Sequence, residues 1–228
     1  MSGHELSDCS VYPPLQEMSI RIHEYGDMTY PEALAALETL VAKRSNHRIP
    51  DSLMLLQHPP TYTFGLRARP EHLLVPETEL KKRNINVFQV DRGGDITFHG
   101  PGQLVGYPVL DLKARQLDIR QYVHRLEQFI IRALADFGVS AHRVEGFPGV
   151  WVDHRKIAAI GVKINAAGIS SHGFAINVNT DLRYFEAIIP CGLRDVQVAS
   201  LAQFTGYRVD MDRVKQSVTE AFLQEFQI

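Results

Sequence analysis

Cysteine is scarce in this chain: its 228 residues include only two, Cys9 and Cys191. Two distant cysteines exclude the disulfide framework of a small secreted protein, and we interpret both as free thiols in a reducing compartment. Long hydrophobic runs are also missing, because a charged residue interrupts every apolar stretch well before the roughly 18 residues of a membrane span. The start of the chain lacks the basic and apolar regions of a signal peptide. Together these absences predict a cytoplasmic protein without a membrane partner.

An excess of either charge is absent as well. Lys and Arg total 24 against 26 for Asp and Glu, which gives a formal net charge of −2 and excludes a global attraction to nucleic acid. The composition, with 45% hydrophobic and 22% charged residues, is typical of a soluble globular domain. At roughly 150 residues per domain, we expect a flexible arm over residues 1–17 and a single domain over 18–228.

Hydrophobic periodicity predicts how strands and helices follow one another. Helical spacing marks 29–44, 118–137 and 210–226, and Asp118 and Gln121 have the spacing of a capping box. A run of three β-rich segments predicts an antiparallel meander, over residues 149–152, 156–164 and 173–179. Strands cluster instead of alternating with helices, which favours an α+β fold with a mixed, largely antiparallel sheet flanked by helices over a doubly wound parallel fold.

Cys191 is the first candidate for chemistry, in the segment IIPCGLRD. Free cysteines are among the most buried residue types, so a small core residue is one interpretation. However, Pro190 and Gly192 flank the sulfur and Arg194 follows closely, which is more typical of a nucleophile on a loop. The residues alone leave both interpretations open.

Lys156 is the second candidate, within the strand RKIAAIGVKI. Alternation predicts that Lys156 shares a face with Ala158, Ile160 and Val162, which would partly desolvate its ammonium group. The alternative is a lysine at a strand edge with its head in water. If Lys156 lies beside Cys191, its charge favours the thiolate, the form that attacks acyl carbons. Lys163, on the opposite face, is expected to be solvated.

A glycine-rich segment, RGGDITFHGPGQLVGYPV, is the third candidate. A turn with a bulge would need one glycine pair, whereas this segment has five glycines, which indicates backbone lying against something. It matches neither the phosphate loop nor the dinucleotide pattern, and an apolar or thioester ligand fits better. His99 and His172 each precede a glycine and could equally be structural. We find no metal-ligand spacing.

These segments resemble the octanoyltransferase family, also called lipoyl(octanoyl) transferase or lipoate-protein ligase B. The resemblance rests on four blocks in order, RGGDITFHGPGQLVGYPVLDL, GVWVDHRKIAAIGVKI, HGFAINVN and PCGL, which run from Arg92 to about Leu193. It implies a fold similar to the catalytic domain of biotin and lipoate ligases. It also implies that the domain over 18–228 is an octanoyltransferase catalytic domain.

The resemblance implies transfer of an octanoyl group from octanoyl-acyl carrier protein to a specific lysine of lipoyl domains, in lipoate biosynthesis. The acceptors would be the lipoyl domains of 2-oxoacid dehydrogenases and the glycine-cleavage H protein. By the same resemblance Cys191 forms the acyl thioester intermediate, and Lys156 lowers the pKa of the thiol and moves protons. No metal or cofactor is required, because the thioester is already activated. The residues that would line the acyl site are Arg92, Gly93, Gly94, Asp95, Ile96, Thr97, Phe98, His99, Ala159, Ile160, Gly161, Gly173, Phe174 and Ala175.

Two further hypotheses concern partners and rival functions. One hypothesis is that a basic group docks the acidic carrier protein, and the alternative is that it is a solvated face. Its members are Arg67, Arg69, Lys81, Lys82 and Arg83. An ATP-dependent lipoate or biotin ligase would share the fold and use the same lysine. A non-enzymatic acyl-binding module would hold a structural Cys191 and form no covalent adduct.

Overall fold

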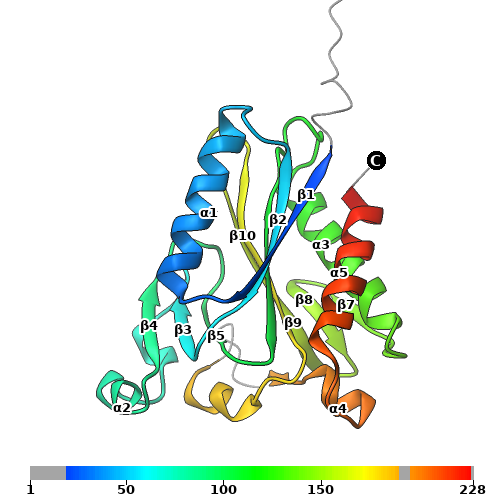
Figure 1. Cartoon of the computed structure of the whole chain (residues 1–228). Coiled ribbons are helices and arrows are strands. Elements are labelled where there is room, and N and C mark those ends of the chain that lie inside the picture. Colours follow the sequence, from blue (N-terminus) through cyan, green and yellow to red (C-terminus); the bar gives the residue numbers. More distant parts are fainter. Residues whose placement is uncertain (1–18, 190–195, 227–228) are drawn as a thin grey trace, which may run out of the picture.

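A long twisted sheet runs through the molecule, with helices on both of its faces (Figure 1). The computed structural model describes residues 19–189 and 196–226. In the main sheet the strands follow the order β1, β2, β6, β10, β9, β8, β7, and β11 pairs with β9. Their bounds are β1 (Ile20–Asp27), β2 (Asp51–Gln57), β6 (Gln103–Val109), β7 (His142–Val144), β8 (Phe147–Val152), β9 (Arg155–Ile164), β10 (Ser170–Asn177) and β11 (Gln197–Val198).

The pairing confirms the predicted sheet. Strands β8, β9 and β10 form the antiparallel meander, and β10 continues antiparallel onto β6 and β6 onto β2. The pairs β1–β2 and β9–β11 are parallel, so the sheet is mixed. The α+β fold class is therefore confirmed. The segment 1–17, with Cys9, and the residue Cys191 lie outside the described residues.

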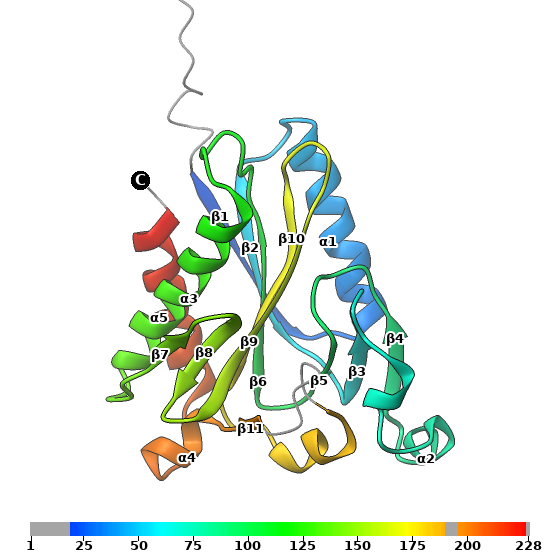
Figure 2. The ribbon, with the colours of Figure 1, turned by 180° about the vertical axis from the view of Figure 1, so that it is seen from behind.

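Helix α1 (Tyr30–Ser45) covers one face of the sheet, and α3 (Ile119–Ala135) and α5 (Met211–Phe226) cover the other (Figures 1 and 2). Helix α3 begins as predicted: the Asp118 carboxylate accepts from the Gln121 backbone N–H at 2.7 Å, and the Gln121 side chain accepts from the Asp118 N–H at 3.0 Å. Apolar residues of α3 and α5 fill the core on that face, and Phe129 meets Phe222 edge to face at 5.2 Å.

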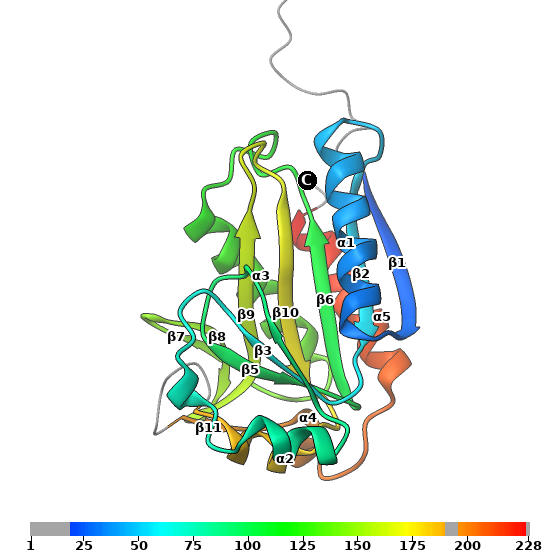
Figure 3. The ribbon, with the colours of Figure 1, turned by 90° about the vertical axis from the view of Figure 1, so that its left-hand side faces the viewer.

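A second, small sheet crosses the face that α1 covers (Figure 3). It contains β4 (Asn86–Gln89), β3 (Thr61–Phe64) and β5 (Ile96–His99), in that order. The remaining short elements are η2 (Pro70–His72), α2 (Glu77–Lys82), η3 (Leu182–Ala187) and α4 (Leu201–Thr205). The segment η3 is a 3₁₀ helix, and the glycine-rich segment contains strand β5. Within the described ranges, none of the helices is both long and apolar enough to span a membrane.

Candidate functional site

Two pairs of very small residues form the floor of a cavity of about 650 Å³. Ala159 of β9 lies opposite Ala175 of β10, and Gly161 lies opposite Gly173. Cross-strand partners project to the same face of a sheet, and Ala175 packs in one cluster with Leu37 of α1. The cavity therefore lies on the α1 face of the main sheet, where these four positions leave space that larger side chains would fill.

The glycine-rich segment before β5 covers this floor. The Gly93 N–H donates to the Val162 carbonyl of β9 at 2.9 Å. A Cβ atom at Gly161 would lie 2.9 Å from the Gly93 carbonyl oxygen, so this close approach requires a glycine there. The Arg92 guanidinium is buried and donates to both the carbonyl and the hydroxyl of Thr63 at 2.8 Å. These bonds fix the segment against the sheet.

Strand β9 contains a bulge beside Lys156. Val150 of β8 pairs with Ala158, whereas the next residue, Trp151, pairs with Lys156. Two steps on β9 thus oppose one step on β8, and Ile157 is the additional residue. The alternation predicted from the sequence is therefore wrong at this point.

The bulge changes which face each side chain occupies. Ile157, expected opposite Ala158, instead packs with it in the core under α3 and α5. Lys156 lines the cavity beside Ala159, a residue that alternation placed on the other face. The predicted desolvation of Lys156 is confirmed, since only 6% of the residue is exposed.

The side chain of Lys156 runs over the β7–β8 hairpin. Its Nζ atom lies 5.3 Å from the centre of the Trp151 ring, within the range of a cation–π contact. A Cβ atom at Gly149 would lie 2.5 Å from Cε of Lys156, so the lysine occupies the space that this glycine leaves. The Gly149 N–H donates to the buried Glu127 carboxylate of α3 at 3.0 Å, which fixes the hairpin.

The residues on both sides of the segment 190–195 lie next to the cavity. On one side, the Ile189 N–H donates to the His72 carbonyl at 2.8 Å. On the other, Val198 lies opposite Lys156 in the β9–β11 pair, and the Ala199 N–H donates to the Lys156 carbonyl at 2.9 Å. His72 and Lys156 both line the cavity.

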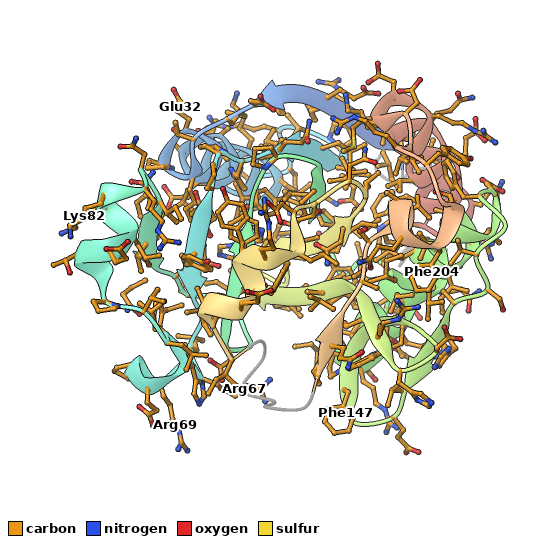
Figure 4. The ribbon with its side chains drawn as sticks, turned by 90° about the horizontal axis from the view of Figure 1, so that it is seen from below. Glu32, Arg67, Arg69, Lys82, Phe147 and Phe204 are labelled. Carbon is orange, nitrogen blue, oxygen red and sulfur yellow. The ribbon has the colours of Figure 1, made fainter. Side chains whose placement is uncertain are left out.

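The rim of the cavity combines apolar and basic side chains from distant parts of the chain. Ile119 from the first turn of α3 and Phe147 from β8 are 57% and 42% exposed. Arg67 and Arg69, between β3 and η2, lie on the opposite side from Phe147 (Figure 4). The basic group expected from the sequence is divided, because Lys82 lies on α2, away from these arginines, and pairs with Glu79 at 3.6 Å.

Five buried rings stand together beside the cavity, and we call them the ring cluster: Tyr30, His58, His99, Tyr107 and His172. Neighbouring ring centres are 5.2 Å apart for Tyr30 and His58, 5.6 Å for His58 and His99, and 6.1 Å for Tyr107 and His172. All but His58 line the cavity. One end of the cavity is therefore polar and aromatic.

Burial keeps the histidines of this cluster neutral, and hydrogen bonds fix their orientation. The ring of His58 donates from Nδ1 to the Met28 carbonyl at 2.8 Å and accepts at Nε2 from the Tyr107 hydroxyl at 2.9 Å. Burial lowers the pKa of His58. His99 donates from Nδ1 to the Gln103 side-chain oxygen at 2.9 Å, and burial, reinforced by His58 and Arg92, lowers its pKa well below the usual range. Near neutral pH the cluster therefore adds no imidazolium charge.

Comparison with known proteins agrees with these features. The catalytic-domain model of lipoyl protein ligases A and B matches residues 29–223. An octanoyltransferase from Desulforamulus reducens is 41% identical over 210 residues, which cover 92% of each chain. One from Rubrobacter xylanophilus is 47% identical over 198 residues, or 86% of this chain and 89% of the relative. The chain belongs to the octanoyltransferase family. Membership makes it an acyltransferase, as its sequence blocks predicted.

The fold is shared more widely than the octanoyltransferase sequence. A bipartite lipoate protein ligase from Thermoplasma acidophilum superposes with a TM-score of 0.69 over 90% of this chain and 82% of that structure, at 19% identity. Biotin protein ligase from Aquifex aeolicus gives a TM-score of 0.51 over 90% and 67%, at 13% identity. At such identities the likeness concerns the fold alone, and it confirms the expected relation to the ligase catalytic domain.

Nearly all of the residues proposed to bind the acyl group line this octanoyltransferase cavity. They are Arg92, Gly93, Gly94, Asp95, Ile96, Thr97, His99, Ala159, Ile160, Gly161, Gly173, Phe174 and Ala175. Phe98 does not: it is 1% exposed and stacks on Tyr184 at 4.5 Å in a separate cluster. Alternate residues of a strand face opposite ways, so Phe98 points away from the cavity that Thr97 and His99 line.

Other lining residues of the octanoyltransferase cavity were not predicted. Tyr30 and Tyr107 lie in α1 and β6, and Ile119 and Val123 belong to the first turns of α3. All four belong to regular helices or strands, and no local sequence pattern separates a cavity wall from a core. Lys163, by contrast, is exposed as predicted and pairs with Asp91.

Proposed function

We propose that this octanoyltransferase moves an octanoyl group from octanoyl-acyl carrier protein to a lysine of a lipoyl domain, through a thioester on Cys191. The observation that carries the proposal is the position of Lys156. Its side chain is buried at a cavity with a floor of alanine and glycine, beside the strand that follows 190–195. A lysine so placed can stabilise a thiolate brought to the same end of the cavity.

Chain connectivity supports bringing Cys191 to this end. Position 191 is two residues beyond Ile189, and two residues span at most about 7 Å. Ile189 is bonded to His72, a lining residue of the cavity. The covalent reach from Ile189 is therefore compatible with a sulfur atom at the cavity.

In the first half-reaction the Cys191 thiolate attacks the carbonyl carbon of the donor thioester. A C–S bond to Cys191 forms, the C–S bond to the carrier arm breaks, and the carrier leaves as a thiolate that takes up a proton. Lys156 supplies positive charge beside the attacking sulfur and exchanges the proton. Exchange of one thioester for another changes the free energy little, so neither a nucleotide nor a metal is needed to drive the step.

In the second half-reaction the amine of the acceptor lysine attacks the acyl-enzyme. A C–N bond forms, the C–S bond to Cys191 breaks, and the proton lost by the amine passes through Lys156 to solvent. The acceptors would be lipoyl domains of 2-oxoacid dehydrogenases and the glycine-cleavage H protein. The reducing compartment that free thiols require favours a cytoplasmic site for the reaction.

The cavity suits an acyl chain of medium length. Octanoyl has six more methylenes than acetyl, and at about 0.8 kcal/mol each their burial is worth at most about 5 kcal/mol. The flat floor of Ala159, Ala175, Gly161 and Gly173 leaves room for those methylenes. Burial alone is therefore sufficient to select octanoyl over acetyl.

Intact-protein mass after incubation with octanoyl-acyl carrier protein, without ATP, tests the proposal. We expect one octanoyl group on the wild type, removable by hydroxylamine, none on Cys191→Ser, and slow acylation of Lys156→Arg, because arginine does not release a proton. An ATP-dependent ligase would form no adduct without ATP and would tolerate Cys191→Ser. An acyl-binding module would bind octanoate and gain no mass. Either result, or full-rate acylation of Lys156→Arg, contradicts the corresponding part of the mechanism.

A further inference from the structure

His172 has an unusual backbone conformation for its position. Its φ angle is +53°, and among the described residues it is the only non-glycine residue with a positive φ inside a β-strand. Such a conformation costs about 1–3 kcal/mol in a residue with a side chain, and it persists where the surrounding structure enforces it. The left-handed turn at this point brings the imidazole to the cavity face of β10, where it meets Tyr107 edge to face.

Two contacts hold the imidazole there. Its Nε2 atom donates to the Asp91 carboxylate at 3.0 Å, and Lys163 also donates to Asp91. Although burial would raise the pKa of Asp91, these two hydrogen bonds lower it, so the group is a carboxylate that accepts from both. The adjacent Tyr107 is fixed through its hydroxyl by His58. Hydrogen bonds therefore hold both rings, His172 and Tyr107, in fixed positions.

The register places these rings at the far end of the cavity from Lys156. His172 lies opposite Val162, six residues along β9 from Lys156, and Gly161 opposite Gly173 lies just before it. At about 3.3 Å per residue, the five steps from Lys156 to Gly161 span at most about 16 Å, because the bulge at Ile157 shortens the strand. An extended octanoyl chain has seven C–C bonds of about 1.5 Å, and their zigzag makes it about 9 Å long from carbonyl to methyl carbon. Contacts of about 3 Å at the carbonyl and about 4 Å at the methyl fill the remaining length.

We propose that His172 and Tyr107 form the end wall of the acyl site and thereby set the longest chain that it accepts. The assignment rests on the proposed function, because it takes the acyl carbonyl to lie beside Lys156. The wall is polar, but the Tyr107 hydroxyl and Nε2 of His172 are hydrogen-bonded within the protein. The methyl end of an octanoyl group can rest on the ring faces without disturbing any of them.

A longer chain must displace the wall. Each additional buried methylene would improve binding about fourfold if space existed. Displacing the imidazole breaks the bond to Asp91, and an unsatisfied buried group weakens binding about fivefold to more than a hundredfold. Steric crowding in a well-packed site adds to that loss. The balance favours rejection of decanoyl and longer groups.

The variant His172→Gly tests the wall directly. Glycine adopts a positive φ without strain, so the variant removes the ring while keeping the backbone. We expect the ratio of kcat/KM for decanoyl over octanoyl carrier protein to rise about tenfold, close to the value of two buried methylenes. Asp91→Ala, which keeps the ring but removes the acceptor shared by His172 and Lys163, should shift the ratio in the same direction by less. Ser171→Gly is the matched control, since it places a glycine at the neighbouring position, which does not line the cavity.

Calorimetric titration with octanoate and decanoate gives a second readout that needs no catalysis. His172→Gly should gain affinity for decanoate relative to octanoate, and Ser171→Gly should not. An unchanged preference in folded His172→Gly, in both assays, overturns the end wall. Absence of a covalent adduct in the wild type would count against the proposed function alone, and the titration would still decide the wall.

Discussion

At the scale of the residue, the placement of Lys156 depends on a bulge in its own strand and on a glycine in the neighbouring strand. The bulge at Ile157 directs the lysine to the cavity face, and the missing side chain at Gly149 gives it room to lie against Trp151. Each is a departure from regular strand geometry at a position beside the proposed chemistry. Bulges are common next to active sites for this reason.

Gly149→Ala should therefore slow acylation by the folded enzyme, although the φ of +128° and the clash with the Ala158 carbonyl also cost stability. The new Cβ atom would meet Cε of Lys156 and the Ala158 carbonyl at 2.5 Å, and the lysine must move. We expect the rate of acyl-enzyme formation, followed by mass, to fall at least tenfold and its pH profile to shift upward as the thiolate loses its partner. Gly206→Ala is the control, because its φ of +79° also disfavours a side chain while nothing lies within 4 Å of the added atom. Equal rates of acyl-enzyme formation in the two variants would show that Gly149 does not position Lys156.

At the scale of the element, long patterns were predictable and short ones were not. Helix α3 begins at its capping box and β8, β9 and β10 form a meander as the sequence indicates, because each pattern extends over many residues. Strands β3 and β5 have four residues each, too few for periodicity to separate a strand from a turn. The bulge in β9 depends on its pairing with β8, which no local pattern contains.

Elements also divide the basic residues into two groups with different surroundings. Arg67 and Arg69 lie at the cavity rim, whereas Lys82 and Arg83, at the end of α2, both pair with Glu79. An acidic carrier protein that delivers its arm to the cavity must approach the rim. The docking hypothesis is therefore narrowed to the two arginines.

Reversal of charge at the rim should weaken recognition of the carrier. We expect Arg67→Glu with Arg69→Glu to raise KM for octanoyl-acyl carrier protein about tenfold at low salt, with a smaller effect at high salt. The pair Lys82→Glu with Arg83→Glu should have less than a third of that effect. An octanoyl pantetheine thioester without the carrier protein should react with all variants alike. Equal increases in KM from both pairs would contradict docking at the rim and would indicate a general attraction between the charged surfaces.

At the scale of the whole molecule, the site exists only after distant segments meet. The floor comes from β9 and β10, the cover from the segment before β5, and the end wall from β6 and β10 with support from α1. The ordered sequence blocks indicated most of these residues through the family resemblance. Tyr30 and Tyr107 were not predicted as site residues, because their role depends on tertiary packing alone.

Burial of neutral histidines also links the fold to pH. Burial lowers the pKa of His58, His99 and His172, although Asp91 partly offsets the effect at His172. In the unfolded chain the same groups titrate near the ordinary value of about 6.5. As the pH falls below that value the unfolded chain takes up protons first, so this contribution to stability is complete above about pH 7 and declines in acid.

The free energy of unfolding should therefore fall between pH 7.5 and 5.5, with a slope that reflects the additional protons bound by the unfolded chain at these three histidines and at His23, whose pKa burial also lowers. Urea unfolding at a series of pH values measures that slope. His58→Asn should flatten it, because one buried imidazole no longer titrates on unfolding. His154→Asn changes an exposed histidine in the β8–β9 turn and is the matched control. A free energy of unfolding that stays constant over this interval would show that the ring cluster accepts protons as readily as the unfolded chain, and that burial does not hold its histidines neutral.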